Sequence, residues 1–344
     1  MLESGAVKRA DPGRMRDIIA ALPDHLEEGL RRGTQIRLDP ADAERMFVVG
    51  MGGSGIAGEV FAAWTADRSR VPIRPVHDYR LPRDAKSGDV LVAMSYSGTT
   101  EETIAATAEG VKLGCRLVAV TSGGALADLA ARSGAPVVKV PTGFPPRGTF
   151  GYQLGILAAL GANFVLGDVR VELERGIAHL RALRKSLRSD VRLRSNRAKS
   201  LAVRLRNRIP VFYAAPPYGP IARRWQTQFN ENAKAIAFTS SFPEADHNEL
   251  VGWSADSRAR SLVPVFLRDF DESSEIRRRL DASASLFSRW TQVEQVRDRG
   301  KTLLDRMLGL LYLGDFTSLY LAVLRKVDPL PVAPIDQLKA RLKR

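Results

Sequence analysis

The chain has 344 residues, of which 44% are hydrophobic, a formal net charge of +14 and a single cysteine, Cys115. Chains longer than roughly 250–300 residues usually divide into more than one core, so we expect two domains. One cysteine cannot form an internal disulfide, and no apolar run approaches the roughly 20 residues needed to span a bilayer. Residues 1–16 lack the hydrophobic region of a signal peptide. These features exclude secreted, membrane and disulfide-rich classes of protein and predict a cytoplasmic one.

In the first half of the chain, short apolar runs alternate with helical segments. The sequence predicts strands over residues 46–50, 71–76, 90–94, 117–121 and 136–140. It predicts helices after Ser54, over residues 101–113 and over residues 150–166. Alternation of this kind is typical of βαβ units, in which helices cover both faces of a parallel sheet.

The same alternation restarts after residue 208. The predicted strands cover residues 211–214, 235–239, 262–267 and 291–296, and the predicted helices cover residues 221–233, 272–287 and 301–327. A proline-containing tail then ends in one or two helical turns. We therefore predict an α/β protein with two domains, each a doubly wound parallel sheet flanked by helices. The first, residues 1–167, has an N-terminal helical extension, and the second is residues 209–344.

Residues 168–208 carry much of the positive charge, with thirteen Lys and Arg against four Asp and Glu. Their apolar residues, among them Leu173, Ile177 and Leu180, recur at helical spacing. We interpret the segment as a solvated basic helical linker between the domains. Nucleic-acid binding is the alternative. It is disfavoured because no aromatic residues interleave with the basic ones to stack against bases.

The first motif that suggests chemistry is GMGGSG, from Gly50 to Gly55, at a predicted strand-to-helix turn. It fits the dinucleotide pattern G-x-G-x-x-G, which also requires an acidic residue about 20 positions later. Asp67 lies too early for that role and Asp78 too late. The glycines also allow the backbone to approach an anion, with the Ser54 hydroxyl at a helix N-terminus. A tight glycine turn without a ligand is the third interpretation.

A second turn, SYSGTTEE from Ser95 to Glu102, follows a predicted strand and opens a helix. Its four Ser and Thr hydroxyls and its glycine form another cradle for an anion, because a helix N-terminus directs backbone N–H groups toward the ligand. Thr99 and Glu102 also have the spacing of a capping box, which would explain one hydroxyl but not a cluster. Two hydroxyl-rich turns after neighbouring strands predict one phosphate group bound from both sides.

Five segments of the chain resemble those of a known family. The turns MGGSGIAGE and SYSGTTEET resemble the sugar isomerase (SIS) fold, and PPRGTFGYQLG, QFNENAKAIAF and FPEADHNELVGW narrow the resemblance. Together they are similar to the bifunctional phosphoglucose/phosphomannose isomerase family, from about Phe47 to Leu342. Thr99 stands where that family more often has Asn, which leaves the neighbouring hydroxyls intact. The resemblance implies two SIS domains, a homodimer, and isomerisation of glucose 6-phosphate, and also of mannose 6-phosphate, to fructose 6-phosphate through a cis-enediol.

The resemblance also implies a set of site residues. Those that bind the substrate are Gly53, Ser54, Ser95, Ser97, Thr100 and Arg147. Glu231 is implied to be the base that moves the C2 proton, and a carboxylate suits this task when burial keeps its pKa near the working pH. Arg147, in a loop after two prolines, is implied to stabilise the enediolate, since a guanidinium stays charged and presents a planar fork of donors.

Two further residues are implied to open the sugar ring. His247 is the ring-opening acid and reaches into the active site of a neighbouring subunit; histidine exchanges protons near neutral pH. Lys339 is implied to act with it. His25, His77 and His179 lie outside the motifs and are predicted to be structural or surface residues. No His, Cys and carboxylate residues have metal-ligand spacing, and the reaction needs neither a metal nor another cofactor.

Three other functions stay open from the sequence. A non-catalytic, regulatory phosphosugar-binding protein would need the hydroxyl-rich turns but not Glu231, His247 and Arg147. Such regulators usually carry a helix-turn-helix, and the residues before Met46 are too few and too weakly patterned for one. A dinucleotide-dependent oxidoreductase has no need of the second turn. Nucleic-acid binding through the basic segment would show a strong dependence on salt.

Overall fold

The computed structural model describes residues 2–40 and 43–342, which fold into two compact units. The N-terminal unit comprises Ala21–Arg181 and Gly300–Leu308, and the C-terminal unit comprises Met1–Ala20, Ala182–Arg299 and Gly309–Arg344. This division differs from the predicted boundaries, because the chain up to Ala20 and most of the basic segment belong to the C-terminal unit. Two helices, α8 (Val169–Leu187) and α13 (Leu303–Arg325), contribute residues to both units.

The N-terminal unit is built on a five-stranded parallel sheet with the order β2-β1-β3-β4-β5. Its strands are β1 (Met46–Gly50), β2 (Ile73–Val76), β3 (Val90–Met94), β4 (Arg116–Thr121) and β5 (Val137–Lys139). Every residue of β1 and β3 is buried, which is typical of central strands covered on both faces. The strands predicted for this half of the chain are confirmed.

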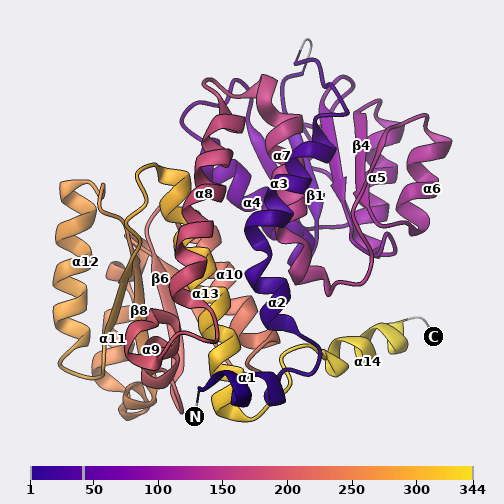
Figure 1. The fold of residues 1–344 in the computed structure, drawn as a ribbon. Coiled ribbons are helices and arrows are strands. Elements are labelled where there is room, and N and C mark those ends of the chain that lie inside the picture. The colour runs from indigo at the N-terminus through magenta and orange to yellow at the C-terminus, as the bar shows by residue number, and fades with distance from the viewer. Residues whose placement is uncertain (1, 41–42, 343–344) are drawn as a thin grey trace. The chain divides into compact units, whose positions relative to one another are not determined.

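Helices cover both faces of this sheet (Figure 1). They are α3 (Leu22–Gly33), α4 (Gly52–Thr65) and α7 (Phe150–Gly161) on one face and α5 (Glu101–Lys112) and α6 (Gly124–Arg132) on the other. Glycines let α3 lie directly against α7. A Cβ on Gly29 would be 2.3 Å from the carbonyl oxygen of Tyr152, and a Cβ on Gly155 would be 2.3 Å from that of Leu26.

The C-terminal unit contains a four-stranded parallel sheet with the order β7-β6-β8-β9. Its strands are β6 (Ile209–Ala214), β7 (Phe238–Ser241), β8 (Leu262–Arg268) and β9 (Glu294–Arg297). Helices again lie on both faces, with α11 (Glu249–Ala255) and α12 (Ser274–Phe287) on one side and α10 (Gly219–Glu231) and α13 on the other (Figure 1). Two parallel sheets flanked by helices confirm the predicted α/β fold class.

The helices of the C-terminal unit come from widely separated parts of the chain. They are α1 (Ser4–Ala10), α2 (Met15–Ala20), α9 (Arg197–Arg204), α10 (Gly219–Glu231), α11 (Glu249–Ala255), α12 (Ser274–Phe287) and α14 (Ala333–Leu342). Lys199 in α9 is only 2% exposed, so the basic segment is not a solvated face throughout. Its Nζ donates to the carbonyl oxygens of Leu2 and Ser189, at 2.7 and 2.8 Å, and thereby ties the start of the chain to the basic segment.

Helix α13 contradicts one premise drawn from the sequence, that no apolar run approaches the length needed to span a bilayer. By length and composition alone it is apolar enough to cross a membrane. Its apolar stretch is entirely buried inside the protein, and the helix also carries Asp305, Arg306 and Asp315. We therefore assign α13 as a core helix.

One predicted strand lies at a different place. The sequence predicts a strand over residues 235–239, whereas β7 begins at Phe238. Lys234 has a φ of +52°, which breaks the backbone direction after α10. The side chain of Asn230 accepts a hydrogen bond from the Ala237 backbone nitrogen at 3.1 Å, where a strand neighbour would otherwise accept it. The apolar run before Phe238 is therefore a loop held by a side chain.

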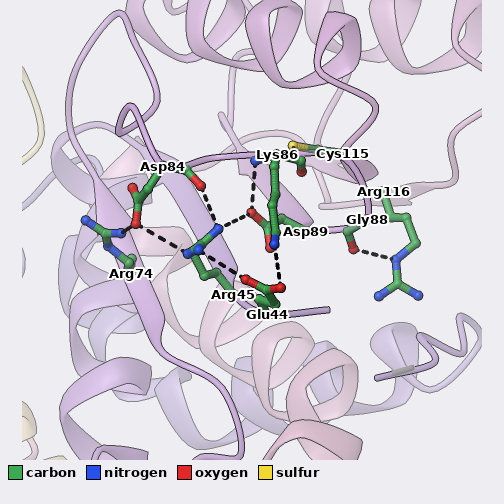
Figure 2. A network of polar contacts seen from close by, with 9 residues as sticks. All are labelled: Glu44, Arg45, Arg74, Asp84, Lys86, Gly88, Asp89, Cys115 and Arg116. Atoms are coloured by element: carbon green, nitrogen blue, oxygen red, sulfur yellow. Dashed lines mark hydrogen bonds and ion pairs between the residues drawn. The ribbon is translucent and has the colours of Figure 1, made fainter. Parts of the chain in front are cut away.

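A charged cluster lies at the amino-terminal edge of the first sheet (Figure 2). Arg45, directly before β1, donates to the carboxylate of Asp89, directly before β3, at 3.0 Å, and to the carbonyl oxygen of Asp84 at 2.6 Å. The Asp84 carboxylate also pairs with Arg74 at 2.6 Å. This cluster joins the starts of neighbouring strands, so it lies at the edge opposite to the turns that follow β1 and β3.

Candidate active site

The first turn of the candidate site joins β1 to α4 and brings its backbone close to another segment. Gly52 has a φ of +49°, which glycine adopts without the steric cost of a Cβ. A Cβ on Gly53 would lie 2.6 Å from the backbone nitrogen of Arg147, so only glycine fits there. The segment that carries Arg147 therefore packs directly against the start of α4.

Ser54, in the first turn of α4, connects the first turn of the site to the second. Its side chain is 5% exposed, and its Oγ accepts a hydrogen bond from the Tyr96 backbone nitrogen at 3.2 Å. The same Oγ accepts a second bond from Nε2 of Gln153 at 3.0 Å. The structure thus brings together the two turns that the sequence predicted to be neighbours.

The second turn, between β3 and α5, is held by its own hydroxyls. Ser95 Oγ accepts a bond from the Gly98 backbone nitrogen at 3.1 Å and lies 2.9 Å from Oγ1 of Thr100. Gly98 has a φ of +68°, and a Cβ there would lie 1.7 Å from the carbonyl oxygen of Gly123. The N-cap of α5 is Thr100 rather than Thr99, and it makes no side-chain cap bond. Oγ1 of Thr99 donates to Ser97 instead, so the capping box of Thr99 and Glu102 is not observed.

The two remaining Ser and Thr hydroxyls of this turn belong to exposed residues, Ser97 and Thr99. Ser97 is exposed, and its Oγ accepts bonds from the backbone nitrogen and Oγ1 of Thr99, at 3.3 and 3.0 Å. The first N–H groups of α4 and α5 have no partner within their helices, as at every helix start. Together with the positive ends of two helix dipoles, these groups can bind an anion such as a phosphate.

Arg147 lies in the 3-10 helix Pro146–Thr149, which leads directly into α7. The Thr149 hydroxyl donates to the Pro146 carbonyl oxygen at 2.7 Å and closes this short turn. Arg147 itself is only 2% exposed. A buried guanidinium keeps its positive charge, so it can stabilise an oxyanion that forms next to it.

His25 lies beside this segment and is buried, with 6% of its surface exposed. Its ring stacks on Tyr152 at 4.5 Å between centroids and meets Phe144 edge-on at 5.2 Å. Burial lowers the pKa of His25 to about 4, and the charge of Asp24 and the hydrogen bond to the Gly148 backbone offset this only in part. The imidazole is therefore neutral at pH 7 and contacts the residue that follows Arg147.

The corresponding edge of the C-terminal unit has the opposite chemistry. Its strand order places the switch point between β6 and β8, where α/β proteins bind ligands. Pro216 and Pro217 follow β6 and offer no backbone N–H groups. A cavity of about 240 Å³ at this edge is lined by three acidic residues, Asp269, Asp271 and Glu272, of which Glu272 is paired with Arg268. Of the two sheets described, that of the N-terminal unit has the hydroxyl-rich turns at its switch point.

Glu231 is the last residue of α10 and is half-buried. The orientation of α10 is set by a polar contact with α13. Arg224 donates to both carboxylate oxygens of Asp315, at 3.1 and 2.8 Å, and Gln228 donates to Oδ1 of Asp315 at 2.9 Å. Since Arg224 and Gln228 lie one helical turn apart on the buried side of α10, this contact determines which way the end of the helix faces.

His247 ends the 3-10 helix Glu244–His247, and its side chain is exposed. Lys339 lies on α14, a helix with no buried residue, and is also exposed. Glu231, His247 and Lys339 thus all belong to the C-terminal unit but stand on three different elements. Within residues 2–40 and 43–342, no group of three or more His, Cys, Asp and Glu could hold a metal ion.

Two residues that shape the N-terminal site were not selected from the sequence. Gln153 is fully buried and bonds to Ser54, and the hydroxyl of Tyr96 accepts a bond from the Phe144 backbone nitrogen at 2.9 Å. The signal for Gln153 was available, since it is the one amide in the apolar run FGYQLGILAALG. A buried amide in such a run has to find a polar partner. Nothing in the sequence distinguishes the hydroxyl of Tyr96.

Comparison with known proteins places this arrangement in a family. Residues 194–342 match the family model described as the bacterial phospho-glucose isomerase C-terminal SIS domain. The bifunctional phosphoglucose/phosphomannose isomerase of Caldicellulosiruptor bescii is 32% identical over 334 residues, which cover 95% of this chain and 98% of that protein. The protein of the same name from Aquifex aeolicus is 34% identical over 297 residues, which cover 86% of this chain and 89% of that protein.

A solved structure supports the fold independently. The C-terminal domain of glucosamine-fructose-6-phosphate aminotransferase from Francisella tularensis superposes with a TM-score of 0.69 at 14% identity, covering 92% of this chain and 98% of that one. That likeness concerns the fold alone. The identity to the curated relatives extends over nearly their whole length, and the chain therefore belongs to the bifunctional phosphoglucose/phosphomannose isomerase family.

Proposed function

We propose that this protein converts glucose 6-phosphate and mannose 6-phosphate reversibly to fructose 6-phosphate. The observation that carries the proposal is the pair of turns joined by Ser54 and the Tyr96 backbone, with two helix N-termini and a buried arginine beside them. These groups can bind an anion such as a phosphate, and they occur in a chain whose family members are named for these reactions. The two aldoses differ only at C2 and share one enediol, so one site can serve both.

The phosphate group is bound by the turns of the N-terminal unit. Ser97 presents an exposed hydroxyl, and the first backbone N–H groups of α4 and α5 complete the set of donors. Ser54, Ser95 and Thr100 line the turns and hold their shape through the bonds described above. Gly53 allows the segment that carries Arg147 to pack against the start of α4. Binding of the phosphate fixes the sugar so that its reacting carbons are presented in one orientation.

The chemical steps are acid–base catalysis. His247, with Lys339, donates a proton to the ring oxygen and accepts the proton of the C1 hydroxyl, so the bond between C1 and the ring oxygen breaks and the open-chain aldehyde forms. The Glu231 carboxylate takes the proton from C2, which gives the cis-enediolate, and returns that proton to C1, while the O2 hydroxyl proton passes to O1 to give the ketose. Arg147 stabilises the negative oxygen of the enediolate with its fixed positive charge. Each proton removed is returned, so the route consumes no metal-bound water, nicotinamide or other cofactor.

We also propose a homodimer in which His247 acts in the site of the partner subunit. His247 is exposed, and Val251, one turn further along, is 72% exposed. Helix α14 carries Ile335, Leu338 and Leu342 at helical spacing with 41%, 56% and 67% of their surfaces exposed. Apolar surface of this kind is typical of a contact with another chain.

We also propose that the protein is soluble and cytoplasmic. This location fits the proposed function, the burial of α13 and the single unpaired cysteine. The proposed partner is a sugar phosphate rather than nucleic acid.

The decisive experiment follows fructose 6-phosphate formed from each aldose 6-phosphate, without added metal or nicotinamide. Glu231→Gln removes the base but keeps the shape of the side chain, so turnover should fall by at least about 1,000-fold, while phosphosugar binding in calorimetry changes little. Full turnover by Glu231→Gln would remove Glu231 from the mechanism. Phosphosugar binding without any turnover by the unmodified protein would instead support the regulatory alternative.

A further inference from the structure

Two acidic residues close to His247 in the sequence, Asp246 and Glu249, are less exposed to solvent than the histidine. In the sequence Asp246-His247-Asn248-Glu249, the Asp246 side chain is 11% exposed and Glu249 is half-buried, whereas His247 is exposed. Carboxylate side chains are usually exposed to solvent, and burial of one costs free energy unless it is hydrogen-bonded. We therefore expect both carboxylates to be hydrogen-bonded, and their partners show which parts of the structure they connect.

Glu249, the first residue of α11, is bonded to the sheet. Its two carboxylate oxygens accept hydrogen bonds from the Tyr213 hydroxyl on β6 and from the Ser240 hydroxyl on β7. Trp253, one turn along α11, donates from Nε1 to the same Tyr213 hydroxyl at 3.0 Å. Burial and, next to it, the Glu249 carboxylate raise the pKa of Tyr213 above its usual value, so this hydroxyl stays protonated and remains a donor.

Asp246 is bonded on the other side of the histidine. Its Oδ1 accepts a bond from the Ser283 hydroxyl at 2.6 Å, and its Oδ2 accepts one from Arg279 at 3.3 Å, both on α12. Between the two acids, His247 ends a four-residue 3-10 helix and Asn248 is the N-cap of α11. Such a short helix has few hydrogen bonds of its own, so the side-chain contacts on either side determine where its last residue lies.

We propose that Glu249 and Asp246 are positioning residues for His247. Each fastens the backbone to a different element, the sheet on one side and α12 on the other, and the backbone between them presents the imidazole in one place. This inference rests on the proposed role of His247 in ring opening. A proton donor acts only within hydrogen-bond reach of its target, so a loosened backbone lowers the rate of that step without weakening phosphate binding.

The test compares Glu249→Ala with Glu249→Gln. The alanine variant should lower kcat by about 10- to 100-fold, the range expected when a catalytic group is misplaced by about 1 Å. Its Kd for fructose 6-phosphate, measured by calorimetry, should stay within about twofold, because the phosphate site is on other elements. Glutamine can still accept one of the two hydroxyl bonds and should recover part of the rate. Glu275→Ala is the matched control, since Glu275 is an exposed carboxylate on α12 and should leave kcat unchanged.

A double-mutant cycle distinguishes positioning from a general loss of structure. If Glu249 acts only through His247, the variant His247→Ala/Glu249→Ala should be no slower than His247→Ala alone. Rates that multiply in the double variant, or a kcat of Glu249→Ala within twofold of the unmodified protein, would overturn the inference. Unchanged activity of His247→Ala would instead contradict the proposed function at that residue. If Glu249→Ala does not fold, Ser240→Ala removes one bond to the same carboxylate and should show a smaller loss of kcat with the same dependence on His247.

Discussion

The hydroxyl of Ser54 accepts a hydrogen bond from the backbone nitrogen of Tyr96 at 3.2 Å, so a side chain of the first turn sets the position of the second. The two turns are 42 residues apart in the sequence, and each follows its own strand. Because Gln153 of α7 donates to the same oxygen, one buried hydroxyl connects three segments of the N-terminal unit. The shape of the proposed phosphate cradle therefore depends on an atom that need not touch the substrate.

Ser54→Ala should weaken substrate binding more than it slows the reaction. Removal of the hydroxyl leaves the Tyr96 N–H and the Gln153 amide without their acceptor, at a cost of about 1–3 kcal/mol for each buried group. We expect KM for glucose 6-phosphate to rise about tenfold with a smaller change in kcat, measured in steady-state assays. Ser122→Ala is the matched control. Its hydroxyl bonds the Tyr96 carbonyl oxygen at 2.6 Å, but its backbone nitrogen bonds the same oxygen and remains in the variant. A KM equal to that of the unmodified protein in Ser54→Ala would contradict the linking role.

Gly98→Ala should disrupt the second turn, whereas Gly134→Ala should not. Both glycines have positive φ angles, +68° and +64°, so alanine is strained at either position by about 1–2 kcal/mol. They differ in space, since a Cβ on Gly98 would collide with the Gly123 carbonyl oxygen and a Cβ on Gly134 would meet nothing within 4 Å. We expect Gly98→Ala to raise KM by at least tenfold and Gly134→Ala to leave it unchanged. Equal KM values for the two variants would show that the close approach at Gly98 is not needed for binding.

His25 makes the stability of the protein sensitive to acid. Its pKa is lowered mainly by burial, from 6.5 to about 4, so between these pH values the unfolded chain binds a proton that the folded one does not. The free energy of unfolding should therefore fall as pH falls from about 6.5 to about 4, by about 3 kcal/mol from this group, and level off below. Urea unfolding of the unmodified protein and of His25→Phe should diverge over this window. The contributions of other titrating groups cancel in the difference between the two proteins. A constant difference from pH 7.5 to pH 4 would show that His25 titrates alike in both states.

Residues that act through their neighbours in the sequence could be predicted, and residues that act over long distances could not. Gly52 and Gly98 predict tight turns, because glycine alone adopts their backbone angles freely. The apolar runs that precede these turns predict the strands. The ring partners of His25 lie on other elements, so no local pattern marks this residue. The apolar run around Gln153 predicts that its amide needs a polar partner, but the partner, Ser54 on α4, is far away in the sequence. Over residues 235–239 a local pattern gave a wrong prediction. The apolar run there favours a strand, but the Asn230 side chain takes the Ala237 backbone hydrogen bond and the strand begins only at Phe238.

The charges at the other edge of the sheet should affect stability but not catalysis. Arg45→Ala removes the partner of Asp89, which is fully buried, and an uncompensated buried charge costs about 3 kcal/mol or more. Arg74→Ala breaks an ion pair whose side chains are 40% and 50% exposed, so it should cost less than about 1 kcal/mol. Both residues belong to the cluster in Figure 2 and lie away from the phosphate cradle, so kcat and KM should be unchanged in folded samples of either variant.

Chemical denaturation of the two variants side by side tests this contrast. The Asp89 carboxylate keeps one bond, from the Lys86 backbone nitrogen to Oδ2 at 3.1 Å, while its Oδ1 has no partner among the described residues. Arg45 is therefore the main compensation for that charge, and its loss should lower the denaturation midpoint far more than the loss of Arg74. Arg45→Ala/Asp89→Asn, which removes the charge along with its partner, should recover part of the lost stability. Equal midpoints for Arg45→Ala and Arg74→Ala would mean that water reaches Asp89 and that the cluster does not hold the strand starts together.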